Sequence, residues 1–148
     1  MPPEAAAIGL AGDTMRTVLT SGFHIRTQKP LALGADSEPE PDATVVRGTA
    51  RDYVRSHPAS AALVVEISAT TLAFDRGRKA ALYAKAGIPE SWIVNLVDQV
   101  LEVHRDPGSL SDNPTEYGYR SGRRLGPSDT VSPLFAPAGT IRIADLLP

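Results

Sequence analysis

The chain has 148 residues, of which 42% are hydrophobic and 22% are charged, and its formal net charge at pH 7 is −2. A chain of this length can bury one hydrophobic core and is short for two ordinary domains, so we expect a single domain. The small net charge argues against a nucleic-acid binder that acts through bulk charge, although locally clustered cations stay compatible with that role. The sequence contains no cysteine, which excludes disulfides, thiolate zinc sites and a cysteine nucleophile.

The absence of cysteine also favours a reducing compartment. No apolar run is long enough to span a bilayer, and no basic segment followed by an apolar one marks a signal peptide. We therefore expect a cytoplasmic protein without a membrane segment.

The first twenty residues have the weakest pattern. An alanine-rich run over 4–10 is interrupted by Gly9 and followed by Gly12, and both glycines disfavour a helix interior. Only a short helix is predicted here, beginning at Asp13 or Thr14 and continuing through residue 19.

From residue 23 the pattern becomes that of strands. Apolar and polar side chains alternate over 23–27, as in a half-exposed strand, and residues 30–33 extend it after a break. The acidic linker 34–41 contains two prolines, which force an extended path into a second strand over 42–46. Residues 47–60 are predicted to form a surface connection with some helical character.

The middle of the chain has the clearest pattern. Residues 63–67 are apolar except for one acid, which is typical of a strand buried on both faces. A helical pattern runs from about 73 to 86, then Gly87 can adopt the left-handed conformation and Pro89 prevents continuation. A strand over 91–95 follows, so this stretch predicts a strand, helix and strand joined as one crossover unit.

The C-terminal third is predicted to consist of short strands and turns. A strand over 100–104 is expected to pair with residues 91–96 as a hairpin. The remaining predictions are a loop over 106–114, a short strand over 116–120, a turn over 123–127, an extended segment over 140–143 and an apolar turn over 144–147.

Two carboxylates lie at the ends of neighbouring predicted strands. Glu66 is close to the end of the buried strand, where an acid needs a partner or a chemical role, and Asp42 opens the strand before it. Two such carboxylates are sufficient for Mg²⁺, which keeps several of its waters and can act beside a phosphodiester. Lys79 is the lysine expected to assist the nucleophile, because it shares one helix face with Asp75 and Tyr83, four residues to either side.

Three motifs follow one another along the chain: SEPEPDATVV over 37–46, LVVEIS over 63–68 and DRGRKAALYAKAGIPESWIV over 75–94. Together they resemble the Uma2-type family of restriction endonucleases, a branch of the PD-(D/E)XK nuclease superfamily, and the ordered set is more specific than any one motif. The resemblance runs from about residue 23 to the C-terminus. It implies an α/β fold with a restriction-endonuclease-like core, in which a mixed β-sheet is flanked by helices.

The resemblance also implies a metal-dependent endonuclease, using Mg²⁺ or Mn²⁺, in which Asp42 and Glu66 bind the metal and Lys79 assists the water nucleophile. In the wider superfamily the lysine follows the acid by two residues, a position that is Ser68 here, whereas this family resembles a branch with the lysine on the helix. Gln28 lies where related nucleases offer a polar group from the preceding strand. The implied partners are nucleic acid, in the first place DNA, and a second copy of the chain in a homodimer.

The front of the chain departs from the family pattern. Family members begin with a helix and hairpin that carry a glutamate, and then have a histidine-containing helix, and the sequence matches neither. We therefore divide the chain into a divergent N-terminal segment over 1–20 and a single endonuclease-like domain over 21–148.

Other interpretations of these residues stay open. Glu66 could be a core acid paired with Lys79 or Arg78. Asp42 could be a turn cap, and Glu40 either a solvated charge or an outer contributor to the site. Asp75 is expected to stabilise the helix dipole rather than bind metal. The alternatives to a nuclease are a catalytically degenerate member that acts as a binding or assembly module, and a hydrolase of another phosphate ester. A basic rim for phosphate contacts, or simply a solvated face, is expected from six cations: Arg76, Arg78, Lys85, Arg120, Arg123 and Arg124.

Overall fold

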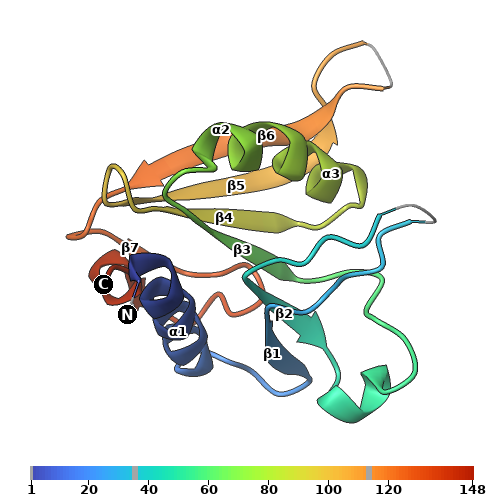
Figure 1. The fold of residues 1–148 in the computed structure, drawn as a ribbon, viewed down its shortest axis with the longest axis horizontal. Helices are drawn as coiled ribbons and strands as arrows, with labels where there is room; N and C mark the ends of the chain where they lie inside the picture. Colours follow the sequence, from blue (N-terminus) through green and yellow to red (C-terminus); the bar gives the residue numbers. More distant parts are fainter. Residues whose placement is uncertain (1, 35–36, 113–114) are drawn as a thin grey trace.

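The computed structural model describes residues 2–34, 37–112 and 115–148, which form a six-stranded sheet with helices on both faces (Figure 1). The α1 helix covers one face, and a helical segment of three consecutive elements covers the other. The predicted α/β fold, with a mixed sheet flanked by helices, is therefore confirmed. The strands, in their order across the sheet, are β1 (Phe23–Thr27), β2 (Ala43–Arg47), β3 (Leu63–Ser68), β4 (Glu90–Asn95), β5 (Val100–Ser109) and β6 (Tyr117–Leu125). The helices are α1 (Pro3–Arg16) and the segment made of α2 (Leu72–Phe74), η2 (Asp75–Lys79) and α3 (Ala80–Lys85).

The sheet is antiparallel except at its centre. β3 and β4 pair in parallel, and the helical segment joins them, so the predicted crossover unit is confirmed. The predicted hairpin is also present, as the antiparallel pair of β4 and β5. Because β2 runs antiparallel to β3, the start of β2 lies beside the end of β3.

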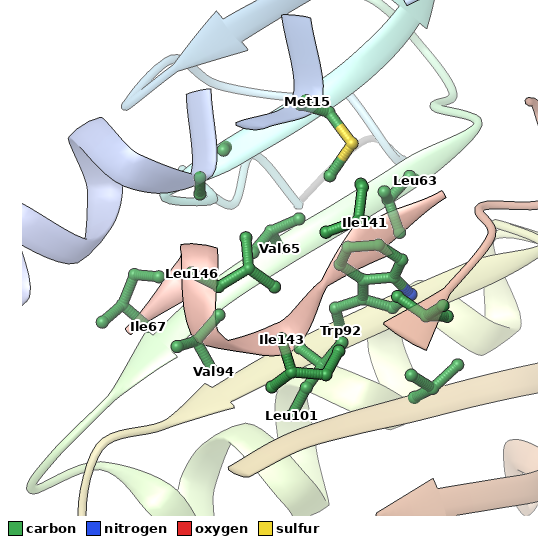
Figure 2. Close-up of a cluster of buried hydrophobic side chains, with 14 of the residues drawn as sticks. Met15, Leu63, Val65, Ile67, Trp92, Val94, Leu101, Ile141, Ile143 and Leu146 are labelled. Carbon is green, nitrogen blue, oxygen red and sulfur yellow. The ribbon is translucent and has the colours of Figure 1, made fainter. Parts of the chain in front are cut away.

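Every residue of β3 is buried, as the apolar pattern predicts. Its alternate side chains enter two separate cores. Leu63, Val65 and Ile67 face α1 and the C-terminal segment, in a cluster that Figure 2 shows around Trp92. Val64 faces the other side, where it packs with Tyr83 of α3, so the helical segment and the even-numbered side chains of β3 share one face.

The N-terminal helix is longer than predicted. It begins at Pro3, whose fixed φ suits the first helical position, and continues through both glycines to Arg16. Gly12 is buried on the side of α1 that faces β1, where a Cβ would make only ordinary contacts, at 3.8 Å from the methyl group of Thr27. The prediction of a helix beginning only at Asp13 or Thr14 is wrong because tertiary packing outweighs the weak local propensity. The division at residue 20 stays a prediction.

The predicted helix over 73–86 is present, but its middle is not an α-helix. Residues 75–79 form one turn of π-helix, called the π-turn below, between α2 and α3. At the end, Gly87 has a φ of 76°, and the N–H groups of Gly87 and Ile88 donate to the carbonyls of Ala84 and Tyr83. This is the Schellman arrangement, and it confirms the predicted termination at Gly87.

The hairpin of β5 and β6 extends beyond the predicted strands. β5 continues through Pro107 and Gly108 to Ser109, and β6 includes the segment from Arg123 to Leu125 that was predicted as a turn. Both predictions are wrong over these residues, because cross-strand pairing overrides turn-like composition. Residues 113–114 of the predicted loop, and 35–36 of the predicted linker, lie outside the described residues.

The strand extension predicted over 30–33 is wrong, because the backbone N–H groups of residues 31–33 bond to loop carbonyls and not to a neighbouring strand. The connection over 47–60 and the C-terminal turn agree with the predictions. The connection 47–60 contains the short helix η1 (Ala50–Tyr53), and near the C-terminus β7 (Thr130–Val131) pairs with β8 (Ile141–Arg142) before the final turn η3 (Ile143–Leu146). None of the helices in the described part of the chain is long and apolar enough to cross a membrane.

Candidate active site

Asp42 and Glu66 lie side by side where β2 begins and β3 ends, and each side chain accepts a hydrogen bond from the backbone of the other strand. The backbone N–H of Asp42 donates to Oε1 of Glu66 at 3.0 Å, and Oδ2 of Asp42 accepts the backbone N–H of Ile67 at 2.7 Å. The antiparallel register of β2 and β3 produces this contact, since Ala43 lies opposite Val65. The two predicted carboxylates are therefore brought together on the face that carries the helical segment.

The helical segment brings two further groups to Glu66. Nζ of Lys79 lies 2.6 Å from Oε2 of Glu66, and the hydroxyl of Tyr83 donates to the same oxygen at 3.0 Å. Lys79 is partly exposed, whereas Glu66 and Tyr83 are buried. The predicted lysine thus reaches the predicted acid. The sequence placed Tyr83 on the helix face of Lys79 but did not reveal the contact of its hydroxyl with Glu66.

Asp75 also belongs to this cluster, although the sequence predicted only a dipole effect for it. Its side chain is buried, and Oδ2 accepts hydrogen bonds from the hydroxyls of Ser68 at 2.7 Å and Thr71 at 2.8 Å. Its other oxygen, Oδ1, lies 3.7 Å from Nζ of Lys79. Thr71, the N-cap residue of α2, therefore binds Asp75 through its side chain and makes no side-chain hydrogen bond to the backbone of the helix.

The cluster carries more negative than positive charge. Burial raises the pKa of Asp42 and of Glu66 above their ordinary values, and the neighbouring Lys79 offsets this only in part. Burial lowers the pKa of Lys79, but the hydrogen bond and charge of Glu66, together with Asp75 and Asp42, outweigh it and raise the pKa. Three acids thus surround one ammonium that stays protonated at neutral pH, a balance that favours a divalent cation.

Comparison with known proteins identifies the family of the chain. A family model, Uma2, described as "Putative restriction endonuclease", matches residues 7–140, which is most of the chain. The chain belongs to the Uma2 family. A crystal structure of "a putative nuclease belonging to DUF820" from Anabaena variabilis has a TM-score of 0.70 at 16% sequence identity, over 99% of this chain and 80% of that one. This likeness shows that the two proteins share a fold. No curated protein matches the sequence.

Mg²⁺ fits the donor set of this Uma2 protein. Oδ1 of Asp42 accepts no hydrogen bond among the described residues, and Oε1 of Glu66 accepts one and has a lone pair left. Within the same residues, no three His, Cys, Asp or Glu side chains are arranged to hold a metal ion. Two carboxylates with water satisfy Mg²⁺, whereas a cage made of protein ligands alone would need more.

Three further residues, Gln28, Glu40 and Ser68, were named as possible contributors to the site, and they differ in how closely they approach the acids. Gln28 adjoins Asp42 through a backbone hydrogen bond of 3.0 Å, but its side chain is exposed. Glu40 is exposed on the segment before Asp42. Ser68 is buried and donates to Asp75. Of the three, Ser68 alone contacts a charged member of the cluster through its side chain within the described residues.

Three of the six cations expected to form a basic rim are paired with acids. Arg76 makes a two-pronged contact with Glu102, at 2.8 and 2.5 Å. Arg120 and Arg124 pair with exposed acids of the hairpin region, Asp106 and Asp98. The other three, which have no ion pair within the described ranges, are Arg78, Lys85 and Arg123.

Without metal, Asp42→Asn is expected to raise the melting temperature of the Uma2 protein by about 1–3 °C at neutral pH. Burial raises the folded-state pKa of Asp42 above its unfolded value, so the ionised form destabilises the fold, whereas Asn can still accept from Ile67. The gain should disappear as the pH falls from the folded to the unfolded pKa, because Asp42 then becomes neutral in both states. Thermal melts in EDTA across this range measure it.

Adding Mg²⁺ supplies the control for this prediction. A cation that binds only the folded state should raise the melting temperature of the wild type and leave that of Asp42→Asn nearly unchanged. A destabilised variant in EDTA would contradict the view that the charge of Asp42 weakens the fold.

Proposed function

We propose that the protein is a metal-dependent endonuclease that hydrolyses phosphodiester bonds of nucleic acid, with DNA as its substrate. The observation that carries the proposal is the contact between Asp42 and Glu66, where β2 begins and β3 ends, with the ammonium of Lys79 beside them. The description of the family and that of the Anabaena protein support the same activity class. We further propose that it works as a cytoplasmic homodimer.

Asp42 and Glu66 would hold Mg²⁺ or Mn²⁺. When bound, the ion would lower the pKa of a water and stabilise the charge that develops on the phosphate. Tyr83 and the backbone of Asp42 each donate a hydrogen bond to Glu66, so they fix its carboxylate in one orientation. Orientation by buried neighbours is what keeps such a group ready for catalysis.

Lys79 contributes a positive charge in this proposal. Its neighbours raise its pKa, so at neutral pH the ammonium has a proton to donate and no lone pair with which to accept one. It would orient the attacking water and stabilise the charge on the phosphate oxygens, rather than act as the general base.

A surface hollow of about 220 Å³ is suited to bind further phosphates of the nucleic-acid strand that would be cleaved at the site. It is lined by Arg76, Glu102, His104, Gly122, Arg123 and Arg124. Glu102 lies two strands from Glu66 in one row of the sheet, which is about 10 Å, or roughly three phosphates along one strand of a duplex. Burial lowers the pKa of His104, so the positive charge of the hollow comes from its arginines.

The double variant Arg123→Gln/Arg124→Gln is expected to weaken duplex binding and to reduce the slope of log K against log salt by up to about 2, because each phosphate contact contributes about 0.9. Its affinity for Mg²⁺ should not change. The matched control is Arg16→Gln/Arg142→Gln, which removes the same charge from two exposed arginines paired with acids away from the hollow. Fluorescence anisotropy at several salt concentrations measures both, and equal slopes would exclude the hollow from the interface.

The test of the function is cleavage of supercoiled plasmid and of single-stranded oligonucleotides, with Mg²⁺, with Mn²⁺ and with EDTA. Cleavage that requires the metal, and that Lys79→Ala lowers about 100-fold, is expected. Both kinds of substrate are included because the site chemistry does not distinguish them.

The second candidate is a binding or assembly module that keeps the fold without catalysis. It is favoured by the lack, within the described residues, of a third acid arranged to hold a metal. A folded wild type that binds no Mg²⁺ in isothermal titration and cleaves nothing would select this candidate. Metal binding without cleavage of nucleic acid would instead direct the search to other phosphate esters.

A further inference from the structure

Asp75 is buried, whereas an acid in the first turn of a helix is usually exposed to solvent. Only 2% of its side chain is exposed, yet it carries a carboxylate between β3 and the helical segment. The hydroxyls of Ser68 and Thr71 saturate Oδ2 and prevent the carboxylate from rotating. Oδ1 is left facing Nζ of Lys79 at 3.7 Å, within ion-pair range but too far for a hydrogen bond.

Lys79 has more donors than Glu66 alone can use. An ammonium has three N–H donors, and the short contact of 2.6 Å to Glu66 takes one of them. Asp75 is the second acid within ion-pair range of this ammonium. The π-turn that begins at Asp75 and ends at Lys79 places both residues toward the sheet.

Both anchors of the ammonium depend on the same strand. Glu66 belongs to β3, and Ser68, two residues later on the same face, holds Asp75. A cation bound at Oε1 of Glu66 would repel the ammonium of Lys79 and weaken its ion pair with Oε2. A second acid, held by Ser68 and Thr71 rather than by Glu66, would keep the ammonium in the site.

We propose that Asp75 is a positioning residue that keeps the Lys79 ammonium beside Asp42 and Glu66, independently of the ion pair with Glu66. This inference rests on the proposed function for its catalytic meaning, but its physical content can be tested without activity. Asp75 itself is not expected to contact the substrate, because its side chain is buried.

The test uses the NMR signal of the lysine ammonium, which is observable only when an ion pair slows its exchange with water. The chain has three lysines, Lys29, Lys79 and Lys85, so Lys79→Arg assigns the signal. The Lys79 signal should persist in the wild type and in Glu66→Gln, where Asp75 still holds the ammonium. It should disappear in Glu66→Gln/Asp75→Asn. Loss in Glu66→Gln alone, or persistence in the double variant, would overturn the proposal.

The control variant is Asp52→Asn. Asp52 also accepts the backbone N–H and the hydroxyl of a threonine at a short helix start, but no ion pair to it is found in the described part of the chain. Combined with Glu66→Gln, it should leave the Lys79 signal unchanged. If the Glu66→Gln/Asp75→Asn variant does not fold, Glu66→Gln/Ser68→Ala replaces it and should broaden the signal, since Ser68 orients Asp75. An unchanged signal there would count against the proposal.

Kinetics separate this proposal from a merely structural role. Asparagine at position 75 can still accept from the two hydroxyls, but its amide would face Lys79 with a donor. Asp75→Asn should therefore lower kcat about 10–100-fold through misplacement of the ammonium, with KM within about twofold of the wild type. A wild type that cleaves nothing while the Lys79 signal behaves as described would remove the nuclease function and leave the positioning role of Asp75 in place.

Discussion

Glu66→Gln is expected to lower metal-dependent cleavage by about 1,000-fold or more, with the protein still folded. The glutamine keeps the size of the side chain, and its one carbonyl oxygen can still accept from the backbone N–H of Asp42, while its amide N–H can donate to the hydroxyl of Tyr83. It removes one of the two carboxylates available to the metal, and metal-derived charge stabilisation of several kcal/mol corresponds to such a factor. Single-turnover cleavage of a labelled duplex, together with isothermal titration of Mg²⁺, measures the loss.

The control for Glu66→Gln is again Asp52→Asn, an acid-to-amide change at a short helix start that should leave cleavage within about twofold. Glu66→Gln should also weaken Mg²⁺ binding, since it leaves only Asp42 with a charge for the ion. Retained cleavage together with retained metal affinity would show that Glu66 is a core acid paired with Lys79, which is the structural interpretation of the same contact.

Glu90→Ala is expected to destabilise the fold by about 3–5 kcal/mol, which is a large part of the stability of an ordinary domain. Glu90 is fully buried at the start of β4. Its Oε2 accepts from the indole of Trp92 and from Nε of Arg105, each at 2.8 Å, and its Oε1 accepts the backbone N–H of Leu134 at 2.9 Å. Alanine would leave all three donors without this partner and the partly buried guanidinium of Arg105 without its counter-charge.

A double-mutant cycle decides whether the guanidinium is responsible. Arg105→Met removes the charge that Glu90 neutralises, so Glu90→Ala/Arg105→Met should be less destabilised than the sum of the single changes. Urea unfolding of the four proteins gives the coupling energy. Additive effects would show that the cost comes from the cavity and from Trp92 rather than from the unpaired Arg105.

The fold was predictable where hydrophobic pattern and terminal signals agree. The buried run of β3 and the stop at Gly87 are strong local signals, and both elements lie where they were predicted. The α1 helix was not predictable, because Gly9 and Gly12 oppose it locally and packing against β1 and the C-terminal segment stabilises it. The prediction of a loop in place of the end of β5 was wrong for a related reason, because hydrogen bonding to β6 compensates for the proline and glycine in that strand.

The candidate site was predictable in part. Spacing placed Asp42 and Glu66 at neighbouring strand ends and put Lys79 on the right helix face, and the structure brings the three together. The structural roles of Asp75 and Tyr83 were missed, although both share a helix face with Lys79 at a spacing of four residues. That spacing was the available signal. What it could not reveal was the π-turn, which depends on how the segment meets the sheet.

The contacts of the site join residues close together in the sequence, and this affects the order in which the parts of the protein can fold. The hydrogen bonds of the site join residues only 24 and 17 positions apart, from Asp42 to Glu66 and from Glu66 to Tyr83. The contact that ties α1 to the C-terminal turn, from Thr14 to Asp145, spans 131 positions. Because closing a longer loop costs more entropy, the acids and the helical segment can assemble before the two ends of the chain meet. Changes in α1 should then alter mainly how fast the finished molecule unfolds, and leave the early assembly of the acid–lysine cluster intact.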